Sequence, residues 1–544
     1  MRTTIIIRYF FLLIAVLGIA GRDVLAQSDF ERKLVLPFGS MSIRSSAVSA
    51  DGLLVYCGTS TKVVGAGIII AVDTSGALRW SLIVRAPSGT INLQSVSVAS
   101  DNSILVSGAN ANGLETSNAI LLSLSATGQL QWTRQYDFGD LLSLPYSHCS
   151  TYDGGTVITG SLAKPDPGKT LHFYGFVLKT TAAGIPEWSY SANYQNASQA
   201  FFNGVAEGKD SSLMLMGYAS YTQPTVQWMT LAQISSTGSI IEQAVYTTTE
   251  KYIYAKSLLQ LSDGSYIISG SASTPPTRRL HSFLSSFGRP SQLQWSMAYD
   301  FSMAEWITSA VELDNTRILA LSLKQVDSNL NGHLFTVDRS GALQQSVSSF
   351  GRGTWDGRCA VIPGDRPKPL LSIMTPESSK AKSSIDISNI DFSLQGCNIE
   401  PATGTSEPLS LDTAVLQFDY APVTLQSDAL TLEVFPTNLT LNTICGEELA
   451  VASIWEDRSL TLYPNPISTA TAVNLTLPAT ITDPVTIILR DATGREVYRA
   501  TREAVTSGEQ VQIPTAGLAS GVYTVELIDA SSFANVWRGK VVVE

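Results

Sequence analysis

The sequence has few charged residues and no concentration of basic ones. Charged residues make up 15% of the 544, and the formal net charge is -11. Binding to the phosphate backbone of a nucleic acid requires lysine and arginine gathered on one face, and no basic stripe is present. The composition therefore predicts no nucleic-acid partner.

Histidine is scarce as well, and catalytic motifs are absent. His148, His172, His281 and His333 lie far apart in the chain, without the spacing of a metal site. There is no nucleotide-binding glycine loop and no nucleophile elbow between a strand and a helix. We therefore predict no catalytic residue, no metal and no cofactor from motifs. A pair of carboxylates for glycoside hydrolysis stays open, because such pairs assemble from distant strands.

Long apolar runs are confined to the N-terminus. Arg2 and Arg8 lead into an uncharged apolar stretch over residues 9–20, and small residues precede a cleavage site after Ala26. Two charged residues interrupt the run before it reaches the roughly 20 residues of a membrane span. Residues 1–26 are therefore predicted to be a secretory signal peptide, and no transmembrane span is predicted in the mature chain.

Five cysteines are an odd number for an exported chain, so at most two disulfides can form. Cys397 and Cys445 flank the least regular segment and are the first choice for a pair. Cys57 and Cys149 fit equally well as buried free thiols within strands.

Short strand-like segments between turns are abundant, and they repeat about every 50 residues, a period typical of repeat folds. The turn aspartates are Asp51, Asp101, Asp153, Asp210, Asp263, Asp314 and Asp365. In the first five repeats a glycine follows seven residues later, at Gly58, Gly108, Gly160, Gly217 and Gly270, whereas Leu321 and Ser372 take that place in the last two.

A second set of turns confirms the repeat unit. Tryptophans follow a glycine turn or its equivalent at Trp80, Trp132, Trp188 and Trp295. Glycine accepts the positive φ of tight hairpin turns. Each unit therefore reads as a strand, an aspartate turn, a strand ending at glycine, a variable loop, a strand, a glycine turn and a strand.

These units predict an all-β protein with a β-propeller over residues 27–397, because sheets stacked around an axis bury a continuous core between them. Seven blades are expected, with six and eight as alternatives and a linear solenoid as the competing architecture. The apolar run from Lys33 to Phe38 is a candidate for the missing strand of the last blade. Residues 398–458 lose the repeat, and both a linker and blade-completing strands remain open there.

The stretch from Asp73 to Trp80 and its copies resemble the tryptophan-bearing repeats of quinoprotein-like (PQQ-like) and related bacterial propellers. The resemblance covers about Ser45 to Gln345 and implies that the tryptophan is a wedge between blades. Enzymes of that family hold their cofactor with other residues, which this sequence does not locate. The resemblance therefore implies architecture and not activity.

Residues 459–544 form a second unit with alternating strands, typical of a small Ig-like antiparallel sandwich. Its three motifs are Tyr463-Pro464-Asn465-Pro466, then Asp491-x-x-Gly494-Arg, then Leu518-x-x-Gly521-Val-Tyr523. The unit closely resembles the type A sorting domain of the type IX secretion system of Gram-negative bacteria. An ordinary Ig-like binding module is the competing interpretation.

The resemblance implies export to the periplasm, recognition by the type IX translocon and passage through the outer membrane. The protein would then be secreted or held on the outer face of that membrane. The sequence leaves open whether it is anchored or released.

Aromatic residues recur in the segments between blades, where a propeller gathers its connections around the channel mouth. The candidate ligand-binding residues are Tyr136, Phe138, Tyr254, Tyr299, Phe301, Trp306 and Trp355, with Tyr146 and Phe202 in related positions. Exposed aromatic rings at such a mouth would stack on sugars or grip a peptide. Packing between blades is the alternative role.

Three functions remain open at this point. The first is a secreted or cell-surface platform that binds a glycan or a protein. The second is an extracellular propeller enzyme, either a carbohydrate-active hydrolase or lyase or a quinone-dependent dehydrogenase. The third is a structural component of the envelope.

Overall fold

The computed structural model describes residues 31–35, 41–60, 65–113, 115–164, 171–222, 225–248, 252–274, 279–301, 305–326, 329–349, 357–362, 368–376, 383–389, 399–402, 404–414, 418–437, 439–445, 461–463, 472–476, 485–491, 496–502, 509–515, 518–529 and 536–543. All regular elements of these residues are strands. None of the described segments is a helix with the length and apolarity needed to cross a membrane. The chain divides into two compact units, Met1–Leu449 and Ala450–Glu544.

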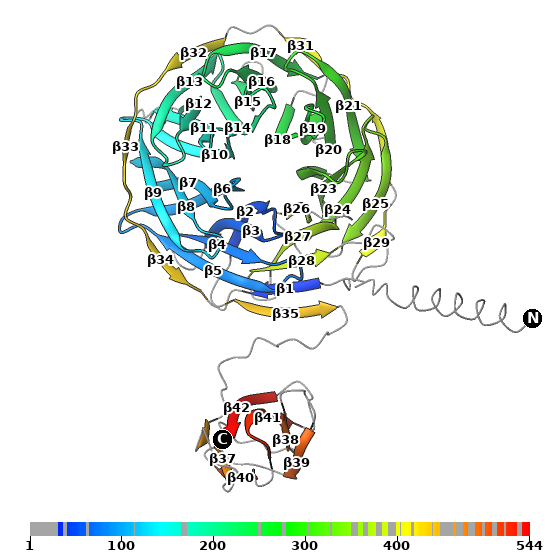
Figure 1. The fold of residues 1–544 in the computed structure, drawn as a ribbon. Helices are drawn as coiled ribbons and strands as arrows, with labels where there is room; N and C mark the ends of the chain where they lie inside the picture. Colours follow the sequence, from blue (N-terminus) through cyan, green and yellow to red (C-terminus); the bar gives the residue numbers. More distant parts are fainter. Residues whose placement is uncertain are drawn as a thin grey trace, which may run out of the picture. The chain divides into compact units, whose positions relative to one another are not determined.

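The first unit is a ring of seven antiparallel blades (Figure 1). Blade 1 contains β2 (Met41–Val48), β3 (Leu54–Ser60), β4 (Ala66–Val72) and β5 (Leu78–Arg85). Blade 2 contains β6 (Thr90–Val98), β7 (Ile104–Asn112), β8 (Thr116–Leu124) and β9 (Leu130–Asp137). Blade 3 contains β10 (Leu142–Ser150), β11 (Thr156–Lys164), β12 (His172–Thr180) and β13 (Pro186–Tyr194).

The remaining blades follow the same order from the axis outward. Blade 4 contains β14 (Gln199–Glu207), β15 (Leu213–Thr222), β16 (Thr225–Ile234) and β17 (Ile240–Thr247). Blade 5 contains β18 (Tyr252–Gln260), β19 (Tyr266–Thr274), β20 (Arg279–Phe287) and β21 (Leu293–Asp300). Blade 6 contains β22 (Glu305–Glu312), β23 (Arg317–Val326), β24 (Asn329–Asp338) and β25 (Leu343–Ser349).

Blade 7 joins the two ends of the repeat region. It contains β26 (Gly357–Ile362), β27 (Lys368–Pro376) and β28 (Ser383–Asn389), and its fourth strand is β1 (Glu31–Val35), which pairs antiparallel with β28. The prediction that the run beginning at Lys33 completes the last blade is confirmed. The count of seven blades is confirmed too, and the alternatives of six and eight are wrong.

Side-chain hydrogen bonds explain why an aspartate recurs in the first turn of each blade. The Oδ1 atom of Asp101 accepts bonds from the backbone N–H of Ser103 at 2.9 Å and from the Ser103 hydroxyl at 2.6 Å. Asn102, between them, has a φ of 64°. An aspartate that accepts from the residue two positions later closes a tight turn without help from distant parts of the chain.

A β-bulge explains the repeat glycine. In β6 the register shifts between Leu93 and Ser95, opposite Gly108. This shift brings the backbone over the glycine, and a Cβ atom on Gly108 would lie 2.2 Å from the carbonyl oxygen of Asn92. In blade 6 the residue opposite the bulge is Ser322. Counting seven residues from Asp314 predicts Leu321, which is one residue earlier.

The apolar core lies between the blades. One cluster joins Val55 and Ile69 of blade 1 to Ile91 and Val106 of blade 2, and similar clusters follow at each later interface. The cluster that contains Leu34 of β1 joins blade 7 to blade 1. Burial between sheets is thus continuous around the ring, as a propeller requires.

The described residues between 399 and 445 form a strap that adds a fifth strand to every blade, drawn from yellow to orange around the ring in Figure 1. The sequence had left a linker and blade-completing strands open for this segment. The strap strands are β29 (Ile399–Pro401), β30 (Thr405–Pro408), β31 (Asp412–Ala414), β32 (Phe418–Pro422), β33 (Gln426–Asp428), β34 (Glu433–Pro436) and β35 (Thr440–Cys445).

The strap follows the blades in reverse order. It pairs first with β25 of blade 6, then in turn with β21, β17, β13, β9 and β5, and last with β1 of blade 7. Strand β1 is therefore held between β28 and β35. The buried side chain of Leu439 packs into the core that joins blade 7 to blade 1. One segment thus covers the outer edge of each blade and reinforces the closure of the ring.

The second unit is a two-sheet sandwich, as expected. One sheet contains β36 (Thr461–Tyr463), β37 (Ala472–Thr476) and β40 (Gln510–Pro514). The other contains β38 (Val485–Arg490), β39 (Glu496–Arg502), β41 (Gly521–Asp529) and β42 (Val536–Val543). Apolar side chains of both sheets form one core, which includes Leu475, Ile513, Leu489 and Val525.

The sequence motifs of the second unit lie at strand ends. Tyr523 is buried in the core, and its hydroxyl donates to the carbonyl of Ala519 at 2.7 Å. Gly521 begins β41, Tyr463 ends β36, and Asp491 directly follows β38. Pro464, Asn465, Pro466 and Gly494 lie outside the described residues.

Among the described residues, Cys57, Cys149 and Cys359 are free thiols. Burial raises the pKa of Cys149 to about 12 and that of Cys359 to about 11. These thiols are therefore protonated and unreactive. The suggested pair of Cys397 with Cys445 lies outside the described part, because Cys397 is not described.

Candidate functional site

The ring has two different faces, because all blades have the same strand order. The aspartate turns and glycine turns lie on one face, which we call the turn face. The loops between second and third strands, and the connections from blade to blade, lie on the other, which we call the loop face. A ligand site near the axis is therefore built from the innermost strands and the loop-face ends of their neighbours.

Four of the aromatic residues proposed from the sequence are buried away from the axis. Tyr136 and Phe138 are 0% and 4% exposed, and Tyr299 and Phe301 are 0% and 2% exposed. The Tyr136 hydroxyl donates to the carbonyl of Gly184 in the next blade at 2.8 Å. The prediction that these four bind a ligand is wrong. They belong to the fourth strands or follow them, and inter-blade packing covers them.

Two of the other proposed aromatics lie on innermost strands. Tyr254 in β18 and Trp306 in β22 are half-buried. Phe202 of β14 pairs with the repeat glycine Gly217, the position that Ala255 and not Tyr254 holds in blade 5, and it is buried against Gly175. Trp355 lies outside the described residues.

Tyr254 belongs to a larger aromatic group on the loop side of blades 3, 4 and 5. Phe201 is its centre, with ring centroids 5.9 Å from Tyr146, 5.2 Å from Phe173 and 4.7 Å from Tyr218. Tyr218 also lies close enough to Tyr146 and Tyr254 for the three hydroxyls to influence one another. We call these five residues, Tyr146, Phe173, Phe201, Tyr218 and Tyr254, the tyrosine cluster.

The environment of the tyrosine cluster keeps its hydroxyls neutral. Burial raises the pKa of Tyr218, and the neighbouring Tyr146 and Tyr254 raise it further. Burial also raises the pKa of Tyr146, whose hydroxyl lies 3.1 Å from the Ser161 hydroxyl. All three tyrosines are half-buried. The cluster offers apolar ring faces with neutral hydroxyl groups beside them.

The sequence contained a signal for Tyr218 that the repeat analysis missed. The residue directly after the repeat glycine is Thr59, Ala109, Ser161 and Ser271 in four blades, and only blade 4 has an aromatic residue there. A departure from the repeat at a half-buried position makes that residue a candidate for function. Comparison of the repeats position by position would have placed Tyr218 among the candidates.

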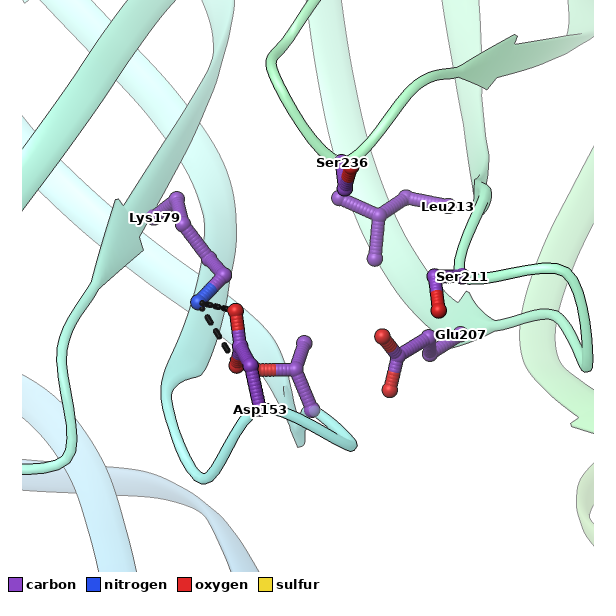
Figure 2. Close-up of a pocket in the computed structure, with 7 residues that line it drawn as sticks. Asp153, Lys179, Glu207, Ser211, Leu213 and Ser236 are labelled. Atoms are coloured by element: carbon purple, nitrogen blue, oxygen red, sulfur yellow. Dashed lines mark hydrogen bonds and ion pairs between the residues drawn. The ribbon is translucent and has the colours of Figure 1, made fainter.

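A separate pocket of about 170 Å³ lies on the turn face between blades 3 and 4 (Figure 2). Asp153 and Lys179 stand on one side, and Glu207 and Ser211 on the other. The Lys179 side chain is 3% exposed, and its Nζ atom lies 2.8 Å from Asp153 and 3.1 Å from Glu187. The lysine is therefore fully engaged by carboxylates.

The two carboxylates that face this pocket have opposite pKa shifts. Burial opposes the ionisation of Asp153, but bonds from Lys179, Thr151 and the Gly155 N–H outweigh it and lower its pKa to about 2. Burial raises the pKa of Glu207, although its Oε2 atom accepts the Tyr152 N–H at 2.6 Å. Divergent pKa values in one pocket are a mark of acid and base roles.

Both carboxylates also have counterparts in other blades, which favours a bracing role. Asp153 is the turn aspartate of its repeat, equivalent to Asp101. Glu207 ends its innermost strand as Glu312 does, and Glu312 accepts the Ser262 N–H at 2.8 Å across the blade interface. Among the described residues, no group of three or more His, Cys, Asp or Glu is arranged to hold a metal ion.

Comparisons with known proteins give one strong result. Residues 461–544 match the family described as the secretion system C-terminal sorting domain. No curated protein matches the chain.

Two solved structures align with this chain at low sequence identity. One is PorZ, described as an essential bacterial surface component of the type-IX secretion system of Porphyromonas gingivalis. It shares 11% identity over 93% of this chain and 82% of its own, with a TM-score of 0.24. The other is the RS223 β-xylosidase, with 10% identity over 48% of this chain and 96% of its own and a TM-score of 0.26.

Proposed function

This chain carries a type IX secretion system C-terminal sorting domain over residues 461–544, and from that premise we propose that its propeller is an extracellular platform that binds glycans. The sorting domain marks the protein for export to the cell surface or the medium. The proposal includes cleavage of the signal peptide after Ala26 and a final place outside the outer membrane. The secretion translocon is then the partner of the second unit, and a glycan is the partner of the first.

The tyrosine cluster is the observation that carries the proposal. It gathers five aromatic rings from three blades on the loop side of the ring, where the blades have different loops. Tyrosine supplies a rigid apolar face at low entropic cost and a hydroxyl that can bond to a polar ligand. Sugars present apolar C–H faces edged by hydroxyl groups, so they suit such a surface. The proposal therefore favours a sugar over an apolar ligand.

Binding of the mature chain, residues 27–544, to a glycan array tests the proposal. Tyr254→Ala should weaken retention of the bound glycan at least about tenfold, the scale of 1.4 kcal/mol. Tyr254→Phe keeps the ring and should retain most of the affinity. Tyr152→Ala is the matched control, because Tyr152 is 69% exposed on the turn face.

The melting temperature separates a lost contact from a lost fold in each variant. A Tyr254→Ala protein that is folded and binds as well as the unchanged chain would contradict the platform. So would a complete absence of glycan binding.

A hydrolase is the second candidate, because the turn-face pocket holds Glu207 with a raised pKa opposite Asp153 with a lowered one. In that mechanism Glu207 donates a proton to the leaving oxygen, and Asp153 acts as the charged partner. Release of reducing ends from the bound glycans measures it. Glu207→Gln should then abolish release, whereas the equivalent Glu312→Gln should not. If no reducing ends are released, the two carboxylates are left with their bracing role.

A further inference from the structure

Six of the seven innermost strands carry a bulge at the same place, and its extra residue differs between blades. The register shifts around one unpaired residue in each of these strands. The bulge residues are Arg44, Gln94, Tyr146, Asn203, Lys256 and Thr308. We call this set the bulge ring. A repeated backbone feature with a different side chain in each blade is a ready place for specificity.

Solvent reaches two of the bulge residues, Arg44 and Lys256. Arg44 is the one exposed residue of β2, and Lys256 is the one exposed residue of β18. Both stand in the middle of their strands. Neighbouring blades cover the two faces of an innermost strand, and the second strand covers its outer edge. Solvent therefore reaches the middle of the strand only from the axis.

Blade 7 adds a third basic residue next to the bulge ring. Arg358, the second residue of β26, donates from Nε to the carbonyl oxygen of Arg44 at 3.0 Å, and its Nη2 atom donates to the same oxygen. The guanidinium group of Arg358 therefore lies against the backbone of the neighbouring bulge. Blades 7 and 1 thus bring the Arg358 guanidinium group to the bulge that carries Arg44.

The charged residues of the bulge ring have the opposite sign to the net charge of the protein. The chain has 46 acidic and 35 basic residues, yet none of the six bulge residues is acidic. The carboxylates with described side chains on innermost strands are Glu207 and Glu312, and each is the last residue of its strand, at the turn face. Charges of one sign enclosed by protein attract the opposite charge more strongly than exposed ones do.

We infer that the propeller binds an acidic glycan, whose anionic groups meet Arg44, Lys256 and Arg358 while its sugar rings meet the tyrosine cluster. Tyr146 belongs to both the bulge ring and the tyrosine cluster, so the two surfaces are continuous. Arginine pairs with carboxylate and sulfate oxygens through two parallel N–H groups. This inference rests on the proposed glycan-binding function and specifies the ligand class.

The test compares three polysaccharides with the full mature chain: polygalacturonate with carboxylates, dextran sulfate with sulfates, and neutral dextran. We expect binding of at least one acidic polymer and at least tenfold weaker binding of dextran. Affinity for the acidic polymer should fall as the salt concentration rises, because salt screens the charges. Equal binding of neutral and acidic polymers would overturn the inference.

Variants at the bulge ring give the second arm. Arg44→Gln and Lys256→Gln should each weaken binding of the acidic polymer about tenfold, and Arg44→Lys should restore part of it. Arg289→Gln removes the same charge from an exposed position on the turn face and should have no effect. Unchanged binding by folded Arg44→Gln and Lys256→Gln proteins would contradict the inference.

The two proposals fail in different ways. If Tyr254→Ala abolishes binding and Arg44→Gln does not, the platform stands and the acidic ligand is wrong. If Arg44→Gln abolishes binding and Tyr254→Ala does not, the anion site stands and the tyrosine platform is wrong.

Discussion

The indole Nε1 of Trp80 donates a hydrogen bond to the carbonyl oxygen of Ala126 in the next blade at 2.9 Å. Trp188 and Trp295 make the same bond to Ser236 and Arg339, at 2.9 Å and 2.7 Å. Each tryptophan thus ties the fourth strand of one blade to the glycine turn of the next. This contact accounts for the repeated tryptophan as a wedge between blades.

Replacing Trp80 with phenylalanine should keep the wedge and remove the bond. We expect the free energy of unfolding to fall by about 1 kcal/mol, the usual net value of one hydrogen bond. Trp132→Phe is the control, because Trp132 occupies the same repeat position and packs on Gly184 without such a bond among the described residues. Urea unfolding of both variants measures the difference. Equal losses would mean that the bond contributes nothing.

A methyl group at the repeat glycine should be costly. In Gly108→Ala the new Cβ atom would lie 2.2 Å from the carbonyl oxygen of Asn92, and the neighbour is backbone that cannot turn aside. We expect a loss of about 3 kcal/mol, at the upper end for an overpacked site. Ser322→Ala in blade 6 is the matched control, because a side chain is already accommodated there. Thermal unfolding of a stable Gly108→Ala protein without a lower midpoint would contradict the bulge geometry.

The strap should stabilise the closure of the ring. Leu439 is 3% exposed and packs between blades 7 and 1, so Leu439→Ala should destabilise the propeller by about 2–5 kcal/mol. Leu430→Ala should destabilise the propeller less, because Leu430 is only half-buried between blades 1 and 2. Limited proteolysis reports the same effect, with faster cleavage of the Leu439→Ala chain. A strap that merely lies on the ring would leave both measurements unchanged.

The protein should lose stability in mild acid because of His148. This ring is 6% exposed and bonds to the hydroxyls of Ser97 and Ser107, and burial lowers its pKa to about 4 from 6.5. Between pH 6.5 and 4 the unfolded chain takes up a proton that the folded chain does not. The free energy of unfolding therefore falls as the pH drops through this window, by about 3 kcal/mol in all.

His148→Gln should remove that slope, whereas the exposed His172→Gln should keep it. The aspartates act in a lower window. Asp153 and Asp314, with pKa values lowered to about 2 from 3.8, lose their stabilising charge only as the pH falls through that range. Stability measured from pH 7 to 2 separates the two steps.

Removal of the second unit should stop delivery without unfolding the first. The division at Leu449 leaves all seven blades and the strap in one unit. We expect residues 1–449 to fold and to accumulate in the periplasm, as followed by cell fractionation and protease accessibility. Delivery of the shortened chain to the surface would show that export uses another signal.

The sequence alone determined the order of strands within a blade, the number of blades and the type of the second unit. These features depend on contacts between close neighbours in the chain. An aspartate bonds two residues further on, as Asp101 does with Ser103, and a glycine faces a bulge in the adjacent strand. Each blade repeats the same local requirements, so a single sequence shows them several times. The closing strand was predictable because one strand was missing from the last repeat.

Only the tertiary structure decided what the strap does and which aromatics reach solvent near the axis. Its strands are three to six residues long and contact partners far away in the chain, such as Ala414 with Val245. Segments that short carry almost no periodic signal of their own. Tyr136 and Tyr254 look alike in sequence, but one lies in an outermost strand under the next blade and the other in an innermost strand. The distance of a strand from the axis, which no local pattern encodes, separates a packing residue from a candidate ligand residue.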